Sequence, residues 1–258
     1  MSIEHIIGAQ YALHDRQFIA NCRDTLDDKG VLVLPDFIQP DAIVKLKREG
    51  MAYMDDAYFC ANSHNVYLTS PDEAFPLGHP RNREVISSKG LIADDQVPED
   101  SPLKTLYRDT VFQAFVASVV GEDRLYPYAD PLSAVNIHYA KTGQELGWHF
   151  DNSSFAITLL IDKPDGGGDF EYLRDVRDAD AGEYNFETVG KLLDGEIKPD
   201  RLNMEPGTLV LFRGRNSIHR VTPTEGQKTR ILAVLAYNSK PGIELSESAR
   251  MTFYGRLG

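Results

Sequence analysis

Two histidines and one aspartate in this sequence have the types and the spacing of a metal site. His149 and Asp151 lie two residues apart in GWHFDNS, and His219 follows much later in FRGRNSIHRVTP. Side chains two apart on a β-strand project to the same face, so His149 and Asp151 can reach one ion together. With His219 they offer two imidazoles and a carboxylate, the donor set that leaves half of the Fe(II) coordination sphere open for oxygen chemistry.

The His-x-Asp spacing alone is weak evidence, because a chain with seven histidines shows accidental pairings. A hydrogen-bonded strand histidine is the simpler alternative. The surroundings favour the metal site, because Arg230 interrupts the apolar run TRILAVLAY eleven residues after His219. A buried guanidinium requires an anionic partner, which a dicarboxylate would provide.

Short strands must position these residues. From residue 134 onward, Gly, Pro and Asp turns separate the strand-like runs SAVNIHYA, SSFAITLLID, GGDFEYL, GTLVLFRG and TRILAVLAYN. The N-terminal part instead shows helical periodicity over 15–28, 40–51 and 102–120, with one strand over 30–38. Helices followed by many short strands predict a mainly β fold, closed or double-sheeted, with helices packed outside.

Two segments carry no sustained strand pattern. Residues 60–100 are rich in Pro, Asn, Ser and Asp, which predicts a long irregular segment of the kind that often carries binding function. Residues 175–200 are acidic with a helical patch, FETVGKLLDGE, and predict an insertion between strands. We interpret this insertion as a solvated loop, and a lid over a pocket is the minority alternative.

Composition excludes several classes of protein. The 258 residues include 27 Lys and Arg against 39 Asp and Glu, a net charge of −12 that disfavours nucleic acid as a partner. Two cysteines without zinc-site spacing fit a reducing, cytoplasmic setting, and neither export nor membrane insertion is indicated. Without repeats or a linker, we expect one domain over 1–258, with a helical part to about 125 and a β core from about 126. No pattern indicates an oligomeric state.

The ordered motifs resemble the Fe(II)/2-oxoglutarate-dependent oxygenase superfamily. They are Y-x₃-G-x₅-H-x-D at 139–151, P-G-x-L-x-x-F at 206–212, H-x-V-x-P at 219–223, and Arg230 beyond them. The resemblance implies a double-stranded β-helix core (jelly-roll, cupin-like) with outer helices, Fe(II) held by His149, Asp151 and His219, and 2-oxoglutarate held by Arg230. Tyr139 and Thr158 are candidate hydroxyl donors to the cosubstrate. For Tyr139, a core tyrosine with its hydroxyl on a backbone carbonyl is an equal alternative.

Within the superfamily, the layout is most similar to the small bacterial oxygenases of free amino acids, which include radical halogenases of lysine and related hydroxylases. Those halogenases carry a small residue where this chain has Asp151, and the small residue leaves a place for chloride. A carboxylate here implies that hydrogen abstraction with O₂ as oxidant is followed by return of hydroxyl. We therefore predict hydroxylation of a free amino acid, with a basic one such as lysine favoured by the resemblance.

Candidates for binding the amino acid lie in several segments. The two arginines of GHPRNREV, Arg81 and Arg83, would clamp a carboxylate, although solvated loop arginines are an equal alternative. Further candidates are Asn152, Asn238 and Tyr254. Asn136 and His138 share the strand face opposite Tyr139, so they point inward only if Tyr139 does not.

Three rival functions remain open at this point. The same chemistry on another small metabolite would not need Arg81 or Arg83. Halogenation or desaturation would give a product of different mass. A catalytically silent β-barrel binding module is disfavoured because all three metal-binding candidates and Arg230 are present.

Overall fold

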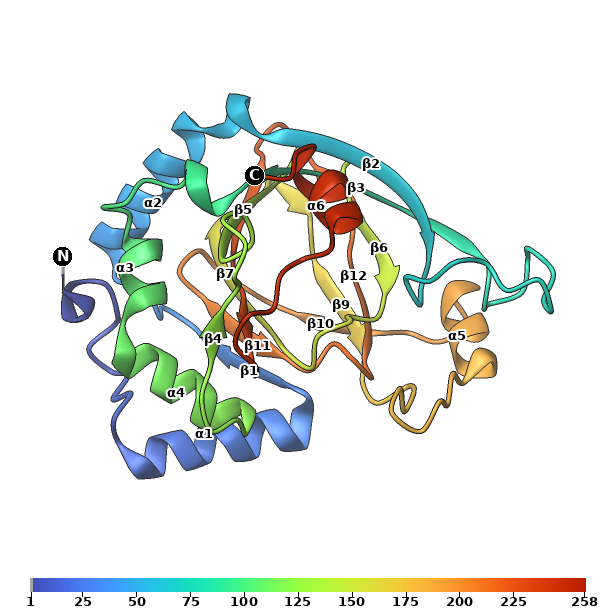
Figure 1. Ribbon diagram of the computed structural model, residues 1–258, viewed down its shortest axis with the longest axis horizontal. Helices are drawn as coiled ribbons and strands as arrows, with labels where there is room; N and C mark the ends of the chain where they lie inside the picture. Colours follow the sequence, from blue (N-terminus) through green and yellow to red (C-terminus); the bar gives the residue numbers. More distant parts are fainter. Residues whose placement is uncertain (1) are drawn as a thin grey trace.

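Eleven strands join in one antiparallel sheet, which curls into the centre of the molecule (Figure 1). The computed structural model describes residues 2–258. The strand order is β1-β11-β7-β14-β5-β3-β6-β12-β9-β10, and β2 pairs with β3 at the side. These strands span Val31–Leu34 (β1), Tyr58–Asn65 (β2), Glu84–Ile92 (β3), Val135–Ala140 (β5), Leu146–His149 (β6), Ala156–Asp162 (β7), Phe170–Leu173 (β9), Asp200–Leu202 (β10), Leu209–Phe212 (β11), Ile218–Val221 (β12) and Arg230–Leu235 (β14).

The remaining strands of residues 2–258 form two small sheets. One pairs β8 (Gly166–Gly167) with β13 (Thr224–Glu225), and the other pairs β4 (Tyr126–Pro127) with β15 (Tyr237–Asn238). The predicted mainly β fold with outer helices is confirmed, and the strand-like runs after residue 134 all contribute strands.

Alternate side chains of the central strands point either to the outer face of the curled sheet, which packs against helices, or to its interior. On β7, Ile157, Leu159 and Ile161 belong to the core cluster that packs against the N-terminal helices. Their alternating neighbours, such as Thr158 and Leu160, face the inside of the curled sheet. Because the side-chain period of a strand is two, each central strand contributes one row to the helix-packed core and one row to the interior.

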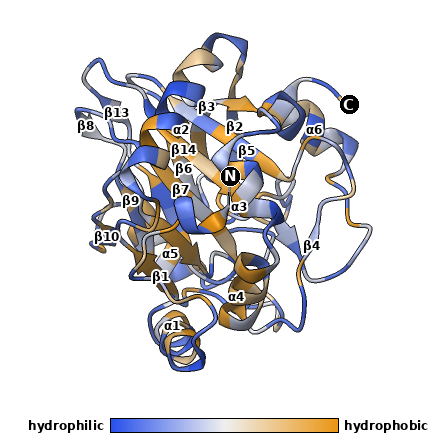
Figure 2. Ribbon diagram, turned by 90° about the vertical axis from the view of Figure 1, so that its left-hand side faces the viewer, coloured by the Kyte–Doolittle hydropathy of each residue, from blue (hydrophilic) through white to orange (hydrophobic). Residues whose placement is uncertain are grey.

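The helices within residues 16–52 and 102–120 cover one side of the sheet, in front of hydrophobic strands, and the helix at Phe186–Leu193 lies on the other side (Figures 1 and 2). The helices span Arg16–Lys29 (α1), Pro40–Ala52 (α2), Pro102–Arg108 (α3), Thr110–Val120 (α4), Phe186–Leu193 (α5) and Glu247–Tyr254 (α6), with 3₁₀ turns at Ile3–His5, Met54–Asp56 and Asp94–Gln96. The single helix predicted over 102–120 is divided, because Asp109 is extended and caps α4 by accepting from the amides of Val111 and Phe112.

The prediction of an irregular segment over 60–100 is wrong in part, because only residues 66–83 form a long stretch without helix or strand. Strands β2 and β3 form a long hairpin there, paired from Tyr58 with Leu91 to Asn65 with Glu84. Strand β3 also lies between β5 and β6 in the main sheet. The part of the chain before residue 126 therefore supplies β1, β2 and β3 to the same sheet as the C-terminal part, and is not helical alone.

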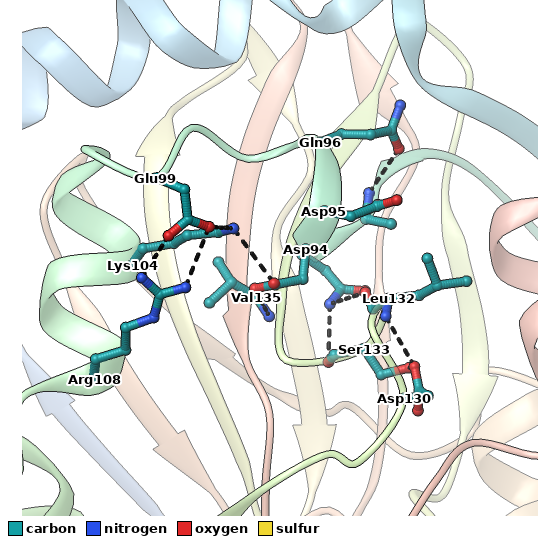
Figure 3. A network of polar contacts seen from close by, with 12 residues as sticks. Asp94, Asp95, Gln96, Glu99, Lys104, Arg108, Asp130, Leu132, Ser133 and Val135 are labelled. Atoms are coloured by element: carbon teal, nitrogen blue, oxygen red, sulfur yellow. Dashed lines mark hydrogen bonds and ion pairs between the residues drawn. The ribbon is translucent and has the colours of Figure 1, made fainter. Parts of the chain in front are cut away.

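A polar network fixes the start of β5 (Figure 3). The amide of Val135 donates to Asp94 over 3.1 Å, and Asp94 in turn lies 3.5 Å from the buried ammonium of Lys104. Lys104, only 3% exposed, also binds Glu99 at 2.6 Å. Asp130 accepts from the amide of Leu132 and the hydroxyl of Ser133. These contacts hold in place the strand that lies beside Arg230.

The helices of residues 2–258 include none that is long and apolar enough to cross a membrane.

Candidate functional site

The two candidate histidines are direct neighbours on adjacent strands. His219 on β12 pairs in register with His149 on β6, and their ring centroids lie 4.1 Å apart. Asp151 follows β6 by two residues, and its Oδ1 lies 3.7 Å from Nε2 of His149 and 3.5 Å from Nε2 of His219. The structure thus brings together the three residues that the spacing predicted, with ligand atoms within 4.8 Å of one another.

Backbone contacts fix which nitrogen of each imidazole faces this cluster. Nδ1 of His149 donates to the carbonyl of Gly147 over 2.8 Å, and Nδ1 of His219 donates to the carbonyl of Ser217 over 3.1 Å. Nε2 of each ring is therefore the nitrogen that faces the space beside Asp151. This is the outer-shell hydrogen bond that orients histidine ligands in metal sites.

The charges in the cluster suit a divalent cation. Burial lowers the pKa of His149 to about 3, and the neighbouring His219 adds to the effect, so His149 is neutral. Burial opposes ionisation of Asp151, but attraction to His219 and His149 outweighs it and lowers the pKa of the carboxyl. Oδ2 of Asp151 is buried without a hydrogen-bond partner in residues 2–258. Two imidazoles and an unsatisfied carboxylate oxygen are the donor set of a facial triad.

Gly214 gives Asp151 the room that it needs, a role that the sequence did not reveal. Its carbonyl accepts from the amide of Asp151 over 3.0 Å. A Cβ at Gly214 would lie 1.9 Å from Oδ2 of Asp151 and 3.0 Å from Cε1 of His219. No side chain fits there without displacing the carboxylate.

We expect Gly214→Ala to weaken metal binding by about tenfold to 100-fold, the range for residues that support metal ligands. Titration of the protein with Mn(II) or Fe(II) measures this change. Gly78→Ala is the matched control, because a Cβ at Gly78 meets no atom within 4 Å and should leave the affinity as it is. Equal affinity of Gly214→Ala and wild type would contradict the placement of Asp151 in the metal site.

The triad faces a cavity of 280 Å³ inside the curled sheet. Most of its wall is apolar, with side chains such as Phe170, Val210, Phe212 and Leu232. Phe212 meets the ring of His219 edge-on at 4.8 Å, and Phe170 stacks on the same ring at 5.4 Å. The packing holds the imidazole in one orientation and surrounds the metal site with a wall of low polarity.

Arg230 lines the same cavity as the triad. It opens β14, is only 6% exposed, and forms no ion pair or hydrogen bond through its guanidinium within residues 2–258. Burial lowers the pKa of Arg230 to about 10, which still leaves it charged at neutral pH. A buried cation without a partner is costly, so an anion in the cavity would stabilise it.

The structure places the two candidate hydroxyl donors on different faces. Thr158 lines the cavity, whereas Tyr139 is fully buried in the helix-packed core. The hydroxyl of Tyr139 donates to the carbonyl of Gly50 in α2 over 2.7 Å. The expectation that Tyr139 binds the cosubstrate does not agree with this position, because the alternation of β5 points it outward and His138 inward.

We expect Tyr139→Phe to lower the free energy of unfolding by about 1–3 kcal/mol, because the buried carbonyl of Gly50 loses its donor. Its affinity for 2-oxoglutarate should equal that of wild type. Denaturant unfolding and calorimetric titration measure the two quantities. A large loss of 2-oxoglutarate affinity without a loss of stability would indicate that Tyr139 binds the cosubstrate.

Most of the predicted substrate residues lie outside the cavity. Arg81 donates to the carbonyl of Ser70 over 3.2 Å, and Arg83 binds Asp194 and the carbonyl of Leu193. Asn152 is exposed, and Asn238 lies half-buried on β15. Tyr254 lines a neighbouring cavity, where its hydroxyl donates to Asn136. Neither arginine therefore reaches the metal site in this structure.

The polar side chains that do face the cavity include Lys89 on β3, which the sequence did not single out, and His138 on β5, which it considered with a condition. No local pattern marks Lys89, because it lies in the segment that was predicted to be irregular. His138 was expected to face inward only if Tyr139 faced outward, which is the arrangement observed.

Comparison with solved structures gives the fold class. An oxidoreductase of the 2OG-Fe(II) oxygenase family from Burkholderia pseudomallei matches with a TM-score of 0.55 at 14% identity, covering 88% of this chain and 93% of that one. A prolyl-4-hydroxylase from Pseudomonas putida gives 0.52 at 11% identity, covering 84% and 96%. The epimerase SnoN of nogalamycin biosynthesis, in complex with Fe³⁺ and alpha ketoglutarate, gives 0.56 at 11% identity, covering 86% and 84%. No curated protein matches the sequence.

The chain therefore has the jelly-roll fold of these 2OG-Fe(II) oxygenase structures, and a His-Asp-His cluster lies inside it. The family model described as Halogenase D matches residues 14–252. The chain belongs to the Halogenase D family.

Proposed function

We propose that this protein is an Fe(II)- and 2-oxoglutarate-dependent dioxygenase that hydroxylates an unactivated C–H bond of a small molecule. The observation that carries the proposal is one cavity that holds both the triad of His149, Asp151 and His219 and the unpaired guanidinium of Arg230. A metal and a dicarboxylate would satisfy the unmet groups at both places.

The residues have separate roles in this reaction. His149, Asp151 and His219 hold Fe(II), and Arg230 holds the distal carboxylate of 2-oxoglutarate, with Thr158 as a candidate donor to the cosubstrate. When bound, these groups supply the oxygen chemistry, in which 2-oxoglutarate and O₂ give succinate and CO₂ and one oxygen atom enters a substrate C–H bond. The protein positions that bond, and the apolar cavity wall limits the access of water.

The outcome that we propose is hydroxylation, although the family takes its name from a halogenase. Support comes from Asp151, whose carboxylate fills the place that halide would need. The tight fit of Gly214 against Asp151 shows that the surrounding backbone accommodates this side chain. Halogenation is the second candidate because of the family name, and desaturation is the third.

The substrate class that we propose is a free amino acid, on the strength of the resemblance to amino-acid oxygenases. The alternative is another small metabolite of similar size. We also propose that residues 1–258 act as one oxygenase domain, because strands from both parts form the sheet that carries the site. A cytoplasmic setting is supported by Cys22 and Cys60, both of which are free thiols.

Product mass tests this proposal. Fe(II)-loaded protein with 2-oxoglutarate, air and chloride is incubated with each free amino acid, and products are identified by mass spectrometry. A gain of one oxygen on one amino acid is the expected result. A gain of chlorine in place of hydrogen, or a loss of two hydrogens, would establish the second or the third candidate, and a product from another metabolite alone would replace the substrate class.

A further inference from the structure

A second cavity, of 160 Å³, adjoins the metal cavity beneath the C-terminal helix. It lies against β3, β5, β14 and α6, and we call it the side cavity. The two cavities adjoin one another, because five residues line both: Lys89, Tyr128, His138, Val234 and Ala236. The side cavity adds Ser133, Asn136 and Tyr254 to the polar groups within reach.

Lys89 lies where the two cavities meet. His138 pairs with Leu91 in register, so Lys89, two residues before Leu91, shares the inner face with His138. Its ammonium lies 5.3 Å from the ring centroid of Phe253 in α6. Lys89 thus lies beside the side cavity, which Arg230 does not line, and Arg230 lies beside Gly168 and Asp169.

The ammonium of Lys89 faces the ring of Phe253 but has no anionic or hydrogen-bonding partner in the described chain. Within residues 2–258 it forms no ion pair and no hydrogen bond through Nζ. Lys104 shows the usual arrangement, since its buried ammonium binds both Glu99 and Asp94. Burial lowers the pKa of Lys89, with Asp151 acting in the opposite direction, so an anion beside the ammonium would stabilise its charged form.

The two cavities contain little negative charge. Among residues 2–258, Asp151 is the one carboxylate that lines the metal cavity, and none lines the side cavity. Lys89 and Arg230 provide two fixed cations, and Arg230 is assigned to the cosubstrate. A second ammonium, such as that of a lysine side chain, would have no carboxylate to bind here except Asp151.

We propose that Lys89 binds the carboxylate of the substrate, which extends along the side cavity and carries no basic side chain. The proposal rests on the proposed function and makes its substrate class narrower: a neutral or acidic amino acid, or a related carboxylic acid. The hydroxyl of Tyr128, which lines both cavities, serves as a further polar contact.

Matched small molecules test this proposal by binding rather than by turnover. Norleucine and norleucinamide differ by the carboxylate, lysine adds an ammonium to norleucine, and hexanoate with hexanamide covers acids without an amino group. The melting temperature of the protein is measured with each compound, both without cofactors and with Mn(II) and 2-oxoglutarate, because a ligand of the folded state raises it. We expect norleucine or hexanoate to stabilise the protein more than its amide, and norleucine more than lysine.

Lys89→Gln should weaken binding of the acid by about tenfold to 100-fold, the range for a charge-assisted hydrogen bond, and remove its advantage over the amide. Lys89→Arg keeps the charge and should keep the preference. Lys191→Gln, which removes an exposed lysine paired with Glu187, is the control and should bind as wild type does.

Any of three results would overturn the proposal. They are a preference for the acid over the amide that persists in Lys89→Gln, stronger binding of lysine than of norleucine, and no stabilisation of the wild type by norleucine or hexanoate. A loss of 2-oxoglutarate affinity in Lys89→Gln as large as that in Arg230→Gln would assign Lys89 to the cosubstrate. Failure of the wild type to bind Mn(II) or 2-oxoglutarate would instead refute the proposed function. In that case the melting temperatures measured without cofactors would still show whether Lys89 is needed for the preference of acid over amide.

Discussion

We expect His219→Ala to abolish turnover and to weaken Fe(II) binding by more than the roughly 100-fold that loss of a supporting residue costs. The reason is that Nε2 of His219 is one of the donor atoms that converge on the space beside Asp151. Metal content after anaerobic loading and gel filtration, together with metal titration, measures the effect. His149→Ala should behave in the same way.

The control for this prediction is His14→Ala, because His14 is exposed near the N-terminus. It should retain metal and activity. His219 is packed between Phe170 and Phe212, so the circular dichroism and melting temperature of each metal-free variant must also be compared with those of metal-free wild type. A folded His219→Ala protein that keeps the metal affinity of wild type would end the assignment of the triad.

Arg230→Gln should weaken 2-oxoglutarate binding by at least roughly 30-fold, corresponding to the 2–5 kcal/mol lost when one partner of a buried charge pair is truncated. The guanidinium is buried in the metal cavity and has no protein anion within ion-pair distance in residues 2–258. Calorimetric titration of the Mn(II)-loaded protein measures the affinity. Metal binding itself should remain unchanged, because Arg230 is not among the donor residues.

The stability of the ligand-free variant provides a second readout. Burial disfavours the charged form of Arg230, as its lowered pKa shows, so a neutral Gln should leave the ligand-free protein at least as stable as wild type. Arg174→Gln is the control, since Arg174 is exposed and pairs with Asp175 at the surface. Unchanged 2-oxoglutarate affinity in Arg230→Gln would move the cosubstrate to another part of the cavity.

Periodicity in the sequence predicted most of the C-terminal strands, and donor chemistry together with the family resemblance predicted that His149, Asp151 and His219 meet. Apolar alternation is strong in such strands because one row packs against the helices, as Ile157, Leu159 and Ile161 do. The β2–β3 hairpin was missed for the opposite reason. Many of its side chains, including Asn62 and Ser63, are polar and exposed, so its pairing leaves little hydrophobic pattern.

The substrate-binding residues could not be predicted from local sequence, because their positions depend on which strands are neighbours in the sheet. Alternation on β5 places Tyr139 and His138 on opposite faces, but does not say which face is the interior. Lys89 enters the cavity only because β3 lies between β5 and β6, and Gly214 matters only because the chain returns beside Asp151. Arg81 and Arg83 were chosen for their chemistry, and tertiary structure places both outside the cavity.

The most direct test of the central claim is succinate formation from 2-oxoglutarate by anaerobically Fe(II)-loaded protein on exposure to air, with His219→Ala as the background. We predict succinate that depends on Fe(II) and 2-oxoglutarate, rises with a suitable substrate, and is absent from the variant. Wild-type protein that binds neither Fe(II) nor 2-oxoglutarate and forms no succinate above the variant would contradict the account, and would indicate a binding module built on the same fold.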